Sequence, residues 1–240
     1  MKKLDVCLSP DLLHLFDLED KVVVVVDILR ATSCMVTGLA YGIDGIIPVA
    51  KLEECRRLQS LGHIAAAERD GMKVEGFDLD NSPFSYMDKN LKGKSIAVTT
   101  TNGTQAIDKS KSAAEIVIGA FLNISALACY LKEKNFDILV VCAGWKGNFN
   151  LEDTLFAGAL AHKLQEDFLI GQDAALAALH MYETNKNDLL AFVSKSQHVN
   201  RLAGLGISKD IAFCLSFDKF DVVPVFADDR LKNIKSLVLN

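Results

Sequence analysis

The stretch that decides the fold is Val22-Val23-Val24-Val25-Val26-Asp27-Ile28-Leu29-Arg30-Ala31-Thr32-Ser33. Five consecutive valines predict a β-strand, because β-branched side chains favour extended backbone and an uninterrupted apolar run suits a strand covered on both faces of its sheet. Residues 31–41 have a helical pattern and follow the strand after a short turn. A buried strand that leads into a helix in this way is typical of layered α/β proteins.

The same alternation of apolar runs and helical patterns continues along the chain. The other strand candidates are residues 5–8, 45–50, 63–67, 94–99, 115–118, 137–142 and 221–226. The other helix candidates are residues 52–61, 103–111, 124–134, 151–165, 172–183 and 208–216. We predict a three-layer α/β/α fold with a mostly parallel or mixed sheet, as a single domain over residues 1–240 with one or two lobes around a cleft.

The composition excludes several classes of protein. Half of the 240 residues are hydrophobic and the net charge is −5, which argues against a nucleic-acid partner because phosphate backbones attract basic surfaces. The six cysteines form no C-x-x-C pair, and this usage fits a reducing compartment. Residues 1–5 lack the apolar core of a signal peptide, so we expect a soluble, cytoplasmic protein without membrane association.

Polar residues follow the valine strand at the point where ligands bind in α/β folds. Asp27 could hold a metal ion or act as a nucleophile, and Arg30 with the amides of Thr32 and Ser33 could hold an anion. The alternative is structural, with Asp27 in a turn and the hydroxyls capping the helix. A phosphoaspartate enzyme of the haloacid-dehalogenase type would need an aspartate at position 29, where this chain has Leu29.

Two further segments combine acidic, basic and capping residues. Glu68 and Arg69 end the apolar run of residues 63–67, and they suit Mg²⁺ and an oxyanion respectively, or form a solvated pair in a turn. Asn81 and Ser82 precede Pro83, a residue favoured at the first position of a helix. Asn81 or Ser82 could cap that helix, and the free amides at its start could bind an anion.

Three more turns complete the candidate site. The turn Thr100-Thr101-Asn102-Gly103 could form a nest of backbone N–H groups around an anion or be a simple Asn-Gly turn. Asp153 lies three residues after Asn150, which reads as a helix cap. Asn123 stands at a helix start, and Cys142, in an apolar strand, is a poor candidate for a nucleophile. His198 and Arg201, on one face of a further helical stretch, are weaker candidates.

Taken together, these segments closely resemble the 2-phosphosulfolactate phosphatase family. The resemblance covers nearly the whole chain in the order of the family's motifs, which is far more specific than any one of them. The matching stretches are VVVVDILRATS, ERDGMKVEGFDLDNSP, TTTNGTQAI, GAFLNISA, VCAGWKGNFNLEDTLFAGAL and SQHVNRLAGLG…DIAFCLSFDKFDVVPVF. Asp80, where the family commonly has glycine, and Trp145 in the glycine-rich loop depart from the pattern and leave the exact substrate open.

The resemblance implies Mg²⁺-dependent hydrolysis of (2R)-2-phospho-3-sulfolactate to 3-sulfolactate and phosphate, a step of coenzyme M synthesis or of other sulfonate metabolism. On this hypothesis Asp27 and Glu68 bind Mg²⁺, with Asp153 as a third candidate ligand. Arg30 and Arg69 complete the expected catalytic set by neutralising phosphate, sulfonate or carboxylate. The expected substrate-binding residues are Thr32, Ser33, Asn81, Ser82, Thr100, Thr101, Asn102, Gly103 and Asn123.

Alternatives to this function stay open. One is a phosphatase for another small phosphorylated hydroxy acid, and another is a protein that binds a phosphorylated anion without hydrolysing it. The density of carboxylates beside arginines argues against a pure anion binder. The number of metal ions, the choice between attack by water and a phosphoenzyme, and a homodimeric state are not decided by the sequence.

Overall fold

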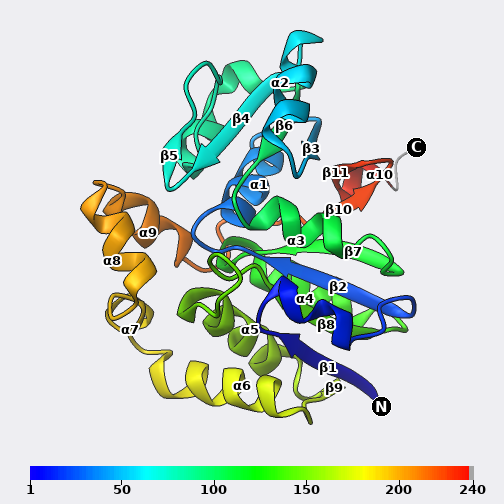
Figure 1. The fold of residues 1–240 in the computed structure, drawn as a ribbon. Coiled ribbons are helices and arrows are strands. Elements are labelled where there is room, and N and C mark those ends of the chain that lie inside the picture. Colours follow the sequence, from blue (N-terminus) through cyan, green and yellow to red (C-terminus); the bar gives the residue numbers. More distant parts are fainter. Residues whose placement is uncertain (238–240) are drawn as a thin grey trace.

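The computed structural model describes residues 1–237, and within them it shows a mixed sheet covered by helices (Figure 1). This confirms the predicted α/β fold class. The strands are β1 Lys2–Cys7, β2 Lys21–Val26, β3 Gly45–Pro48, β4 Ile64–Arg69, β5 Met72–Lys73, β6 Ser95–Thr99, β7 Glu115–Gly119, β8 Asp137–Cys142, β9 Phe168–Leu169, β10 Pro224–Ala227 and β11 Arg230–Asn233.

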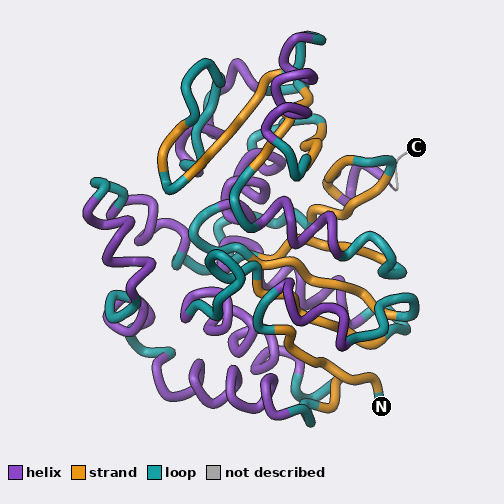
Figure 2. The backbone as a smooth tube through the Cα atoms, viewed as in Figure 1, coloured by secondary structure: helices purple, strands orange, loops and turns teal. Residues whose placement is uncertain are grey.

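The helices occupy the intervals between the strands and lie on the outside of the sheet (Figure 2). The α-helices are α1 Ala31–Ala40, α2 Leu52–Ser60, α3 Gly103–Lys109, α4 Ile124–Lys132, α5 Leu151–Leu164, α6 Asp173–Asn185, α7 Leu189–Val193, α8 Gln197–Gly204, α9 Ser208–Cys214 and α10 Ile234–Leu237. Short 3₁₀ helices are η1 Pro10–Leu15, η2 Pro83–Met87, η3 Lys89–Leu91 and η4 Phe121–Asn123.

The sheet consists of two parallel groups of strands joined by the C-terminal hairpin. Its order is β5-β4-β6-β3-β11-β10-β7-β2-β8-β1-β9. Strands β4, β6 and β3 run parallel to one another, as do β7, β2, β8, β1 and β9. The antiparallel hairpin β10–β11 links the groups by pairing Val225 with Val117 and Leu231 with Ile46. The two groups therefore share one sheet, and the organisation into one or two lobes stays a prediction.

Strand β2 lies in the middle of the second group, between β7 and β8. Its five valines are each 0% exposed. This explains why the run is apolar throughout, since α5 and α3 pack against this strand in addition to the neighbouring strands. The end of β2 is thereby fixed in the interior, and Asp27 emerges from a rigid element.

The C-terminal part differs most from the sequence-based prediction. The predicted strand at residues 221–226 begins only at Pro224, and β11 was not predicted. The two strands are joined through Asp228 and Asp229, which both have positive φ. Such two-residue hairpin turns usually contain Asn-Gly or Asp-Gly. The Asp-Asp pair is not one of these dipeptides, so nothing in the sequence clearly indicated a hairpin here.

The long segment of residues 69–92, which reads as a loop in the sequence, contains β5 and the 3₁₀ helices η2 and η3. Pro83 does open η2, as its position predicted. Within residues 1–237 the structure has no helix with both the length and the apolar character needed to cross a bilayer.

Candidate active site

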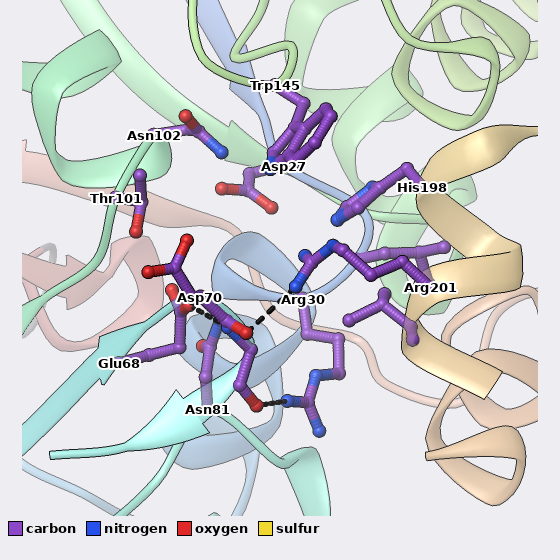
Figure 3. A pocket seen from close by; sticks show the side chains of 13 residues that line it. Asp27, Arg30, Glu68, Asp70, Asn81, Thr101, Asn102, Trp145, His198 and Arg201 are labelled. Carbon is purple, nitrogen blue, oxygen red and sulfur yellow. Dashed lines mark hydrogen bonds between the residues drawn. The ribbon is translucent and has the colours of Figure 1, made fainter. Parts of the chain in front are cut away.

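A pocket lies beside the carboxyl ends of β2, β4 and β6 (Figure 3). Both parallel groups of strands contribute to it, and helix α8 lies across it from the sheet (Figures 1 and 3). The lining residues are Asp27, Leu29, Arg30, Glu68, Asp70, Gly71, Asn81, Thr101, Asn102, Trp145, His198, Arg201 and Leu202.

Asp27 is held at the end of β2 by its own turn. The hydroxyl of Thr32 accepts a hydrogen bond from the Asp27 amide (3.1 Å) and donates one to the Asp27 carbonyl (2.9 Å). The amide of Ala31 donates to the carboxylate of Asp27 at 3.3 Å. The side chain is therefore directed into the pocket while only 8% of the residue is exposed.

The electrostatic surroundings raise the pKa of Asp27 to about 6. Burial is the main cause because it removes the carboxylate from water, and the negative charge of Glu68 acts in the same direction. The positive charge of His198 opposes this rise and is the strongest opposing influence. Asp27 therefore lies close enough to both Glu68 and His198 for their charges to change its pKa.

The acidic side of the pocket also contains oxygen atoms without partners. Glu68, 8% exposed, accepts a hydrogen bond from the amide of Gly71. The side-chain oxygens of Asn81 and Thr101 are buried and have no hydrogen-bond partner among the described residues. A buried polar atom left unpaired by the protein calls for a partner such as water, an ion or a ligand, because its desolvation is not otherwise compensated.

These atoms fit a hard cation of the Mg²⁺ type. Mg²⁺ is usually bound by one or two carboxylates and completes its shell with water and substrate phosphate. Asp27 and Glu68 supply the two carboxylates, and Asn81 and Thr101 supply neutral oxygens. In residues 1–237 no group of three or more His, Cys, Asp or Glu side chains is arranged to hold a metal ion.

The cations of the pocket differ in how far they are neutralised. The guanidinium of Arg30 forms a buried ion pair with Asp210 of α9. Lys146, which is not among the lining residues, pairs with the lining residue Asp70 at 3.0 Å. Arg201 donates through Nη1 to the carbonyl of Asp70 (2.8 Å), while its Nε is buried without a partner among the described residues. Arg201 therefore has the least compensated guanidinium of the pocket.

Three side chains form a stack at the mouth of the pocket. The rings of Trp145 and His198 are stacked with centroids 5.9 Å apart and an angle of 15° between their planes. The guanidinium of Arg201 lies over the Trp145 ring at 5.3 Å. Stacking of this kind fixes the orientation of the imidazole and the guanidinium.

Two of the predicted charged residues lie outside the pocket. Arg69 follows Glu68 on β4 and, because successive side chains of a strand point to opposite faces, it binds the Glu68 carbonyl (2.6 Å) and the Thr99 hydroxyl (3.2 Å). Asp153 is 0% exposed. Its oxygens accept from the amides of Ile28 and Gly144 and from the side chain of Asn150.

Burial raises the pKa of Asp153 well above its usual range, and the nearby charge of Asp27 adds to the rise. With three N–H groups already directed at it, the carboxylate of Asp153 ties the turn after β2 to the loop after β8. The structure places it behind Asp27 rather than among the cavity-lining residues.

The predicted substrate-binding residues are only partly brought together. Asn81, Thr101 and Asn102 line the pocket. The hydroxyls of Thr32 and Ser33 bind backbone carbonyls of their own turn, and Thr100 accepts from the amide of Thr104 at the start of α3. These are structural roles in the turns that shape the pocket.

The remaining predicted residues also lie outside the lining. The amide of Ser82 donates to Asp80 before η2. Asn123 is fully buried and binds backbone groups of Ile118, Ala120 and Val222. Gly103 lies directly behind Asp27, where an added Cβ atom would be 2.9 Å from its Oδ2.

Sequence reasoning gave little weight to the pocket residues contributed by α8 and by the glycine-rich loop. His198 and Arg201 are three residues apart on α8, so they share a face of that helix. Asp70 and Trp145 stand in turns that match the family's motifs, but neither was singled out there as a site residue. The available signal was the helical spacing of His198 and Arg201 after the cap residue Ser196, and only the folded chain shows that this face meets Asp27.

Comparison with known proteins gives one consistent result. Residues 7–229 match the family model described as 2-phosphosulpholactate phosphatase. A protein of Caldanaerobacter subterraneus subsp. tengcongensis named probable 2-phosphosulfolactate phosphatase is 44% identical over 223 residues, covering 90% of each chain. Relatives with the same name are 44% identical over 210 residues in Thermotoga petrophila (88% of this chain, 91% of that one) and 36% identical over 234 residues in Clostridium acetobutylicum (95% and 99%).

The match extends from β1 to the turn between β10 and β11, so it includes every element that lines the pocket. It agrees with the resemblance found in the motifs and with a pocket that combines buried carboxylates and cationic side chains. The chain belongs to the 2-phosphosulfolactate phosphatase family, whose members are named as phosphoric monoester hydrolases.

Proposed function

We propose that this protein hydrolyses 2-phosphosulfolactate to 3-sulfolactate and phosphate with the help of Mg²⁺. The observation that carries the proposal is the joint burial of Asp27 and Glu68 opposite Arg201 in one small pocket. A bare pair of carboxylates repels an anion, whereas a pair that holds a divalent cation attracts one. The family relationship supports the same substrate.

Asp27 and Glu68 would hold the metal ion, and the unpaired oxygens of Asn81 and Thr101 would bind to it or to its water. When bound, Mg²⁺ supplies positive charge to the phosphate oxygens and acidifies a bound water. The protein itself contributes a rigid carboxylate at the end of β2 and exclusion of bulk water from the reacting phosphate.

Arg201 would bind one of the substrate's anionic groups outside the phosphate. Its buried Nε has no partner among the described residues, and the Trp145 ring fixes the plane of its guanidinium. A guanidinium presents parallel N–H donors that match a sulfonate or a carboxylate. Arg30, already paired with Asp210, would contribute less net charge to the substrate.

The test is phosphate release from synthetic 2-phosphosulfolactate by the purified protein, with Mg²⁺ and with a chelator. We expect release only with Mg²⁺, and its loss in Asp27→Asn. Glu53→Gln, which neutralises an exposed carboxylate on α2, is the matched control and should retain full activity.

A panel of esters separates the alternatives. A preference for a phosphorylated hydroxy acid without a sulfonate would replace the sulfolactate substrate while keeping the reaction. Tight binding of the ester in calorimetry with no phosphate released under any metal condition would identify an anion-binding protein and contradict the proposal.

A further inference from the structure

We propose that His198 is the general acid that protonates the ester oxygen as it leaves phosphorus, and that Glu152 is the residue that positions it. The inference rests on the proposed phosphatase function and assigns a step of that reaction to residues outside the acidic side of the pocket. It comes from a buried contact between a histidine and a glutamate that the carboxylate chemistry of Asp27 and Glu68 does not use.

His198 is anchored through one of its two ring nitrogens. Its Nδ1 lies 2.5 Å from the Oε1 atom of Glu152, a residue 46 positions earlier in the chain. The Glu152 side chain is completely buried and that of His198 is 9% exposed. Because Nδ1 is engaged with Glu152, Nε2 is the nitrogen left for the cavity, into which the ring projects beside Asp27 (Figure 3).

Within residues 1–237, the Glu152 carboxylate has His198 as its one hydrogen-bonding partner. Its Oε2 atom is buried and unpaired among the described residues. An ionised carboxylate at 0% exposure is strongly unfavourable unless a positive charge lies next to it. The adjacent imidazole can supply that charge, and its contact through Nδ1 holds the ring so that Nε2 faces the cavity.

The remaining charged groups of the pocket surround this imidazole. The acidic ones are Asp27 after β2 and Glu68 and Asp70 at the end of β4, and the basic ones are Arg30 and Arg201. Asp27 is near enough for His198 to lower its pKa. Trp145, stacked at 5.9 Å, restrains the ring in one plane. The imidazole is therefore fixed in direction and faces the carboxylate side of the pocket.

The chemistry of the substrate requires such a group. In hydrolysis an oxygen, from water or from a carboxylate, forms a new bond to phosphorus while the ester P–O bond breaks. The electron pair of the broken bond goes to the ester oxygen of the hydroxy acid, an alkoxide of high basicity. The proton on Nε2 transfers to this oxygen, leaving a neutral imidazole that regains a proton from solvent when the alcohol has departed.

The test compares leaving groups. We expect His198→Asn to slow phosphate release from 2-phosphosulfolactate by roughly 10²- to 10⁴-fold, the usual contribution of a general acid. With 2,4-dinitrophenyl phosphate, whose phenolate leaves without a proton, the same variant should differ from the unmodified enzyme by less than tenfold. Equal slowing with both esters would overturn the proposal and assign His198 a binding role.

A second measurement does not depend on the aryl ester being accepted. With ¹⁸O in the bridging ester oxygen of 2-phosphosulfolactate, loss of the acid leaves negative charge on that oxygen in the transition state. The isotope effect on kcat/KM should therefore be larger for His198→Asn than for the unmodified enzyme, and equal effects would contradict the inference. If the unmodified enzyme releases no phosphate from 2-phosphosulfolactate, the proposed function fails instead.

Variants of the neighbouring groups separate positioning from folding. Glu152→Gln should lower kcat for 2-phosphosulfolactate with little change in KM, and it should spare the dinitrophenyl ester. His162→Asn is the matched control, since His162 forms a similar pair with Glu183 at 3.2 Å on the surface. It should leave both activities unchanged, whereas parallel losses for both esters in Glu152→Gln would show that Glu152 has only a structural role.

Discussion

The guanidinium of Arg30 is paired with the carboxylate of Asp210, 180 residues further along the chain, and both side chains are almost completely buried. The second guanidinium nitrogen of Arg30 approaches the carbonyl of Gly71 at 3.4 Å. The turn after β2 is thereby tied both to α9 and to the turn after β4. Arg30 therefore connects the segments that enclose the pocket.

Removal of one partner of this pair should destabilise the protein. Asp210→Ala leaves the Arg30 charge buried and unpaired, which typically costs about 3–5 kcal/mol. Urea unfolding should show this loss, together with reduced phosphatase activity because α9 is released. Asp108→Ala removes the exposed pair with Lys111 and should change stability by about 0.5 kcal/mol or less. Similar effects of the two variants would show that the buried pair does not hold α9.

The raised pKa of Asp27 predicts a pH-dependent cost of keeping this carboxylate in the pocket. The native state holds the proton up to a pH of about 6, whereas the unfolded chain releases it near its ordinary value of 3.8. Stability should therefore fall as pH rises through this window and stay reduced above it. Asp27→Asn removes the charge, so in the presence of a chelator it should be more stable than the unmodified protein by roughly 1–3 kcal/mol at pH 7.5.

The same comparison at pH 4.5 provides the control for the Asp27 prediction. There the native carboxyl is protonated, so most of the difference between the two proteins should disappear. A constant difference between pH 4.5 and pH 7.5 in urea unfolding would contradict a raised pKa for Asp27.

Addition of Mg²⁺ should stabilise the folded protein through binding to the acidic side of the pocket. A ligand at about 100 times its Kd stabilises a protein by roughly 2.7 kcal/mol, and the midpoint of thermal unfolding rises accordingly. The rise should be absent in Glu68→Gln and present in Glu53→Gln, which differ in the position of the lost carboxylate. An unchanged response in Glu68→Gln would exclude Glu68 as a ligand.

Gly103 should be intolerant of a side chain because of Asp27. An added Cβ atom would lie 2.7 Å from the Cβ of Ala31 and 2.9 Å from Oδ2 of Asp27. Gly103→Ala should lower the free energy of unfolding by about 1–3 kcal/mol and displace the Asp27 carboxylate. This loss is expected even though alanine has a higher helix propensity than glycine. Gly204→Ala in α8 places its Cβ more than 4 Å from any atom of residues 1–237 outside its own turn, and should be neutral or slightly stabilising. Thermal unfolding and activity of the two variants decide the comparison.

Arg201 and Arg69 should differ in their effect on the substrate. Arg201→Gln should raise KM for the sulfonated ester roughly 10- to 100-fold, the value of a charge-assisted hydrogen bond of about 1.5–3 kcal/mol. Arg69→Gln should change KM far less, because the Arg69 guanidinium lies outside the pocket. There it donates to the backbone carbonyl of Glu68 and to the side-chain hydroxyl of Thr99. A larger effect at Arg69, measured in steady-state kinetics, would restore its predicted role in substrate binding.

The sequence predicted those features that depend on residues close to one another along the chain. The valine run predicted a strand buried on both faces, and Asp27 at its end was a site candidate because strand ends in α/β sheets meet ligands. Pro83 and Asn150 marked helix starts that the structure contains. These features depend on a few neighbouring residues, and a single sequence contains all of them.

Local patterns did not show which of the candidate residues line the pocket. Asp153 and Asn123 have the residue types of a polar site, yet hydrogen bonds to distant backbone groups hold both in the interior. Arg69 is adjacent to Glu68 but points to the opposite face of β4. Burial and direction depend on what packs against a residue, and sequence spacing does not contain that information.

The amino-acid sequence by itself determined the layered α/β fold, the family and the carboxylate at the end of β2. Only the tertiary structure brought His198 to Glu152, Arg30 to Asp210 and Arg201 to the mouth of the pocket, across 46, 180 and 131 residues. The physical reason is that these contacts are long-range. They exist only in the folded chain, where α8, α9 and the turns after the strands come together around the pocket.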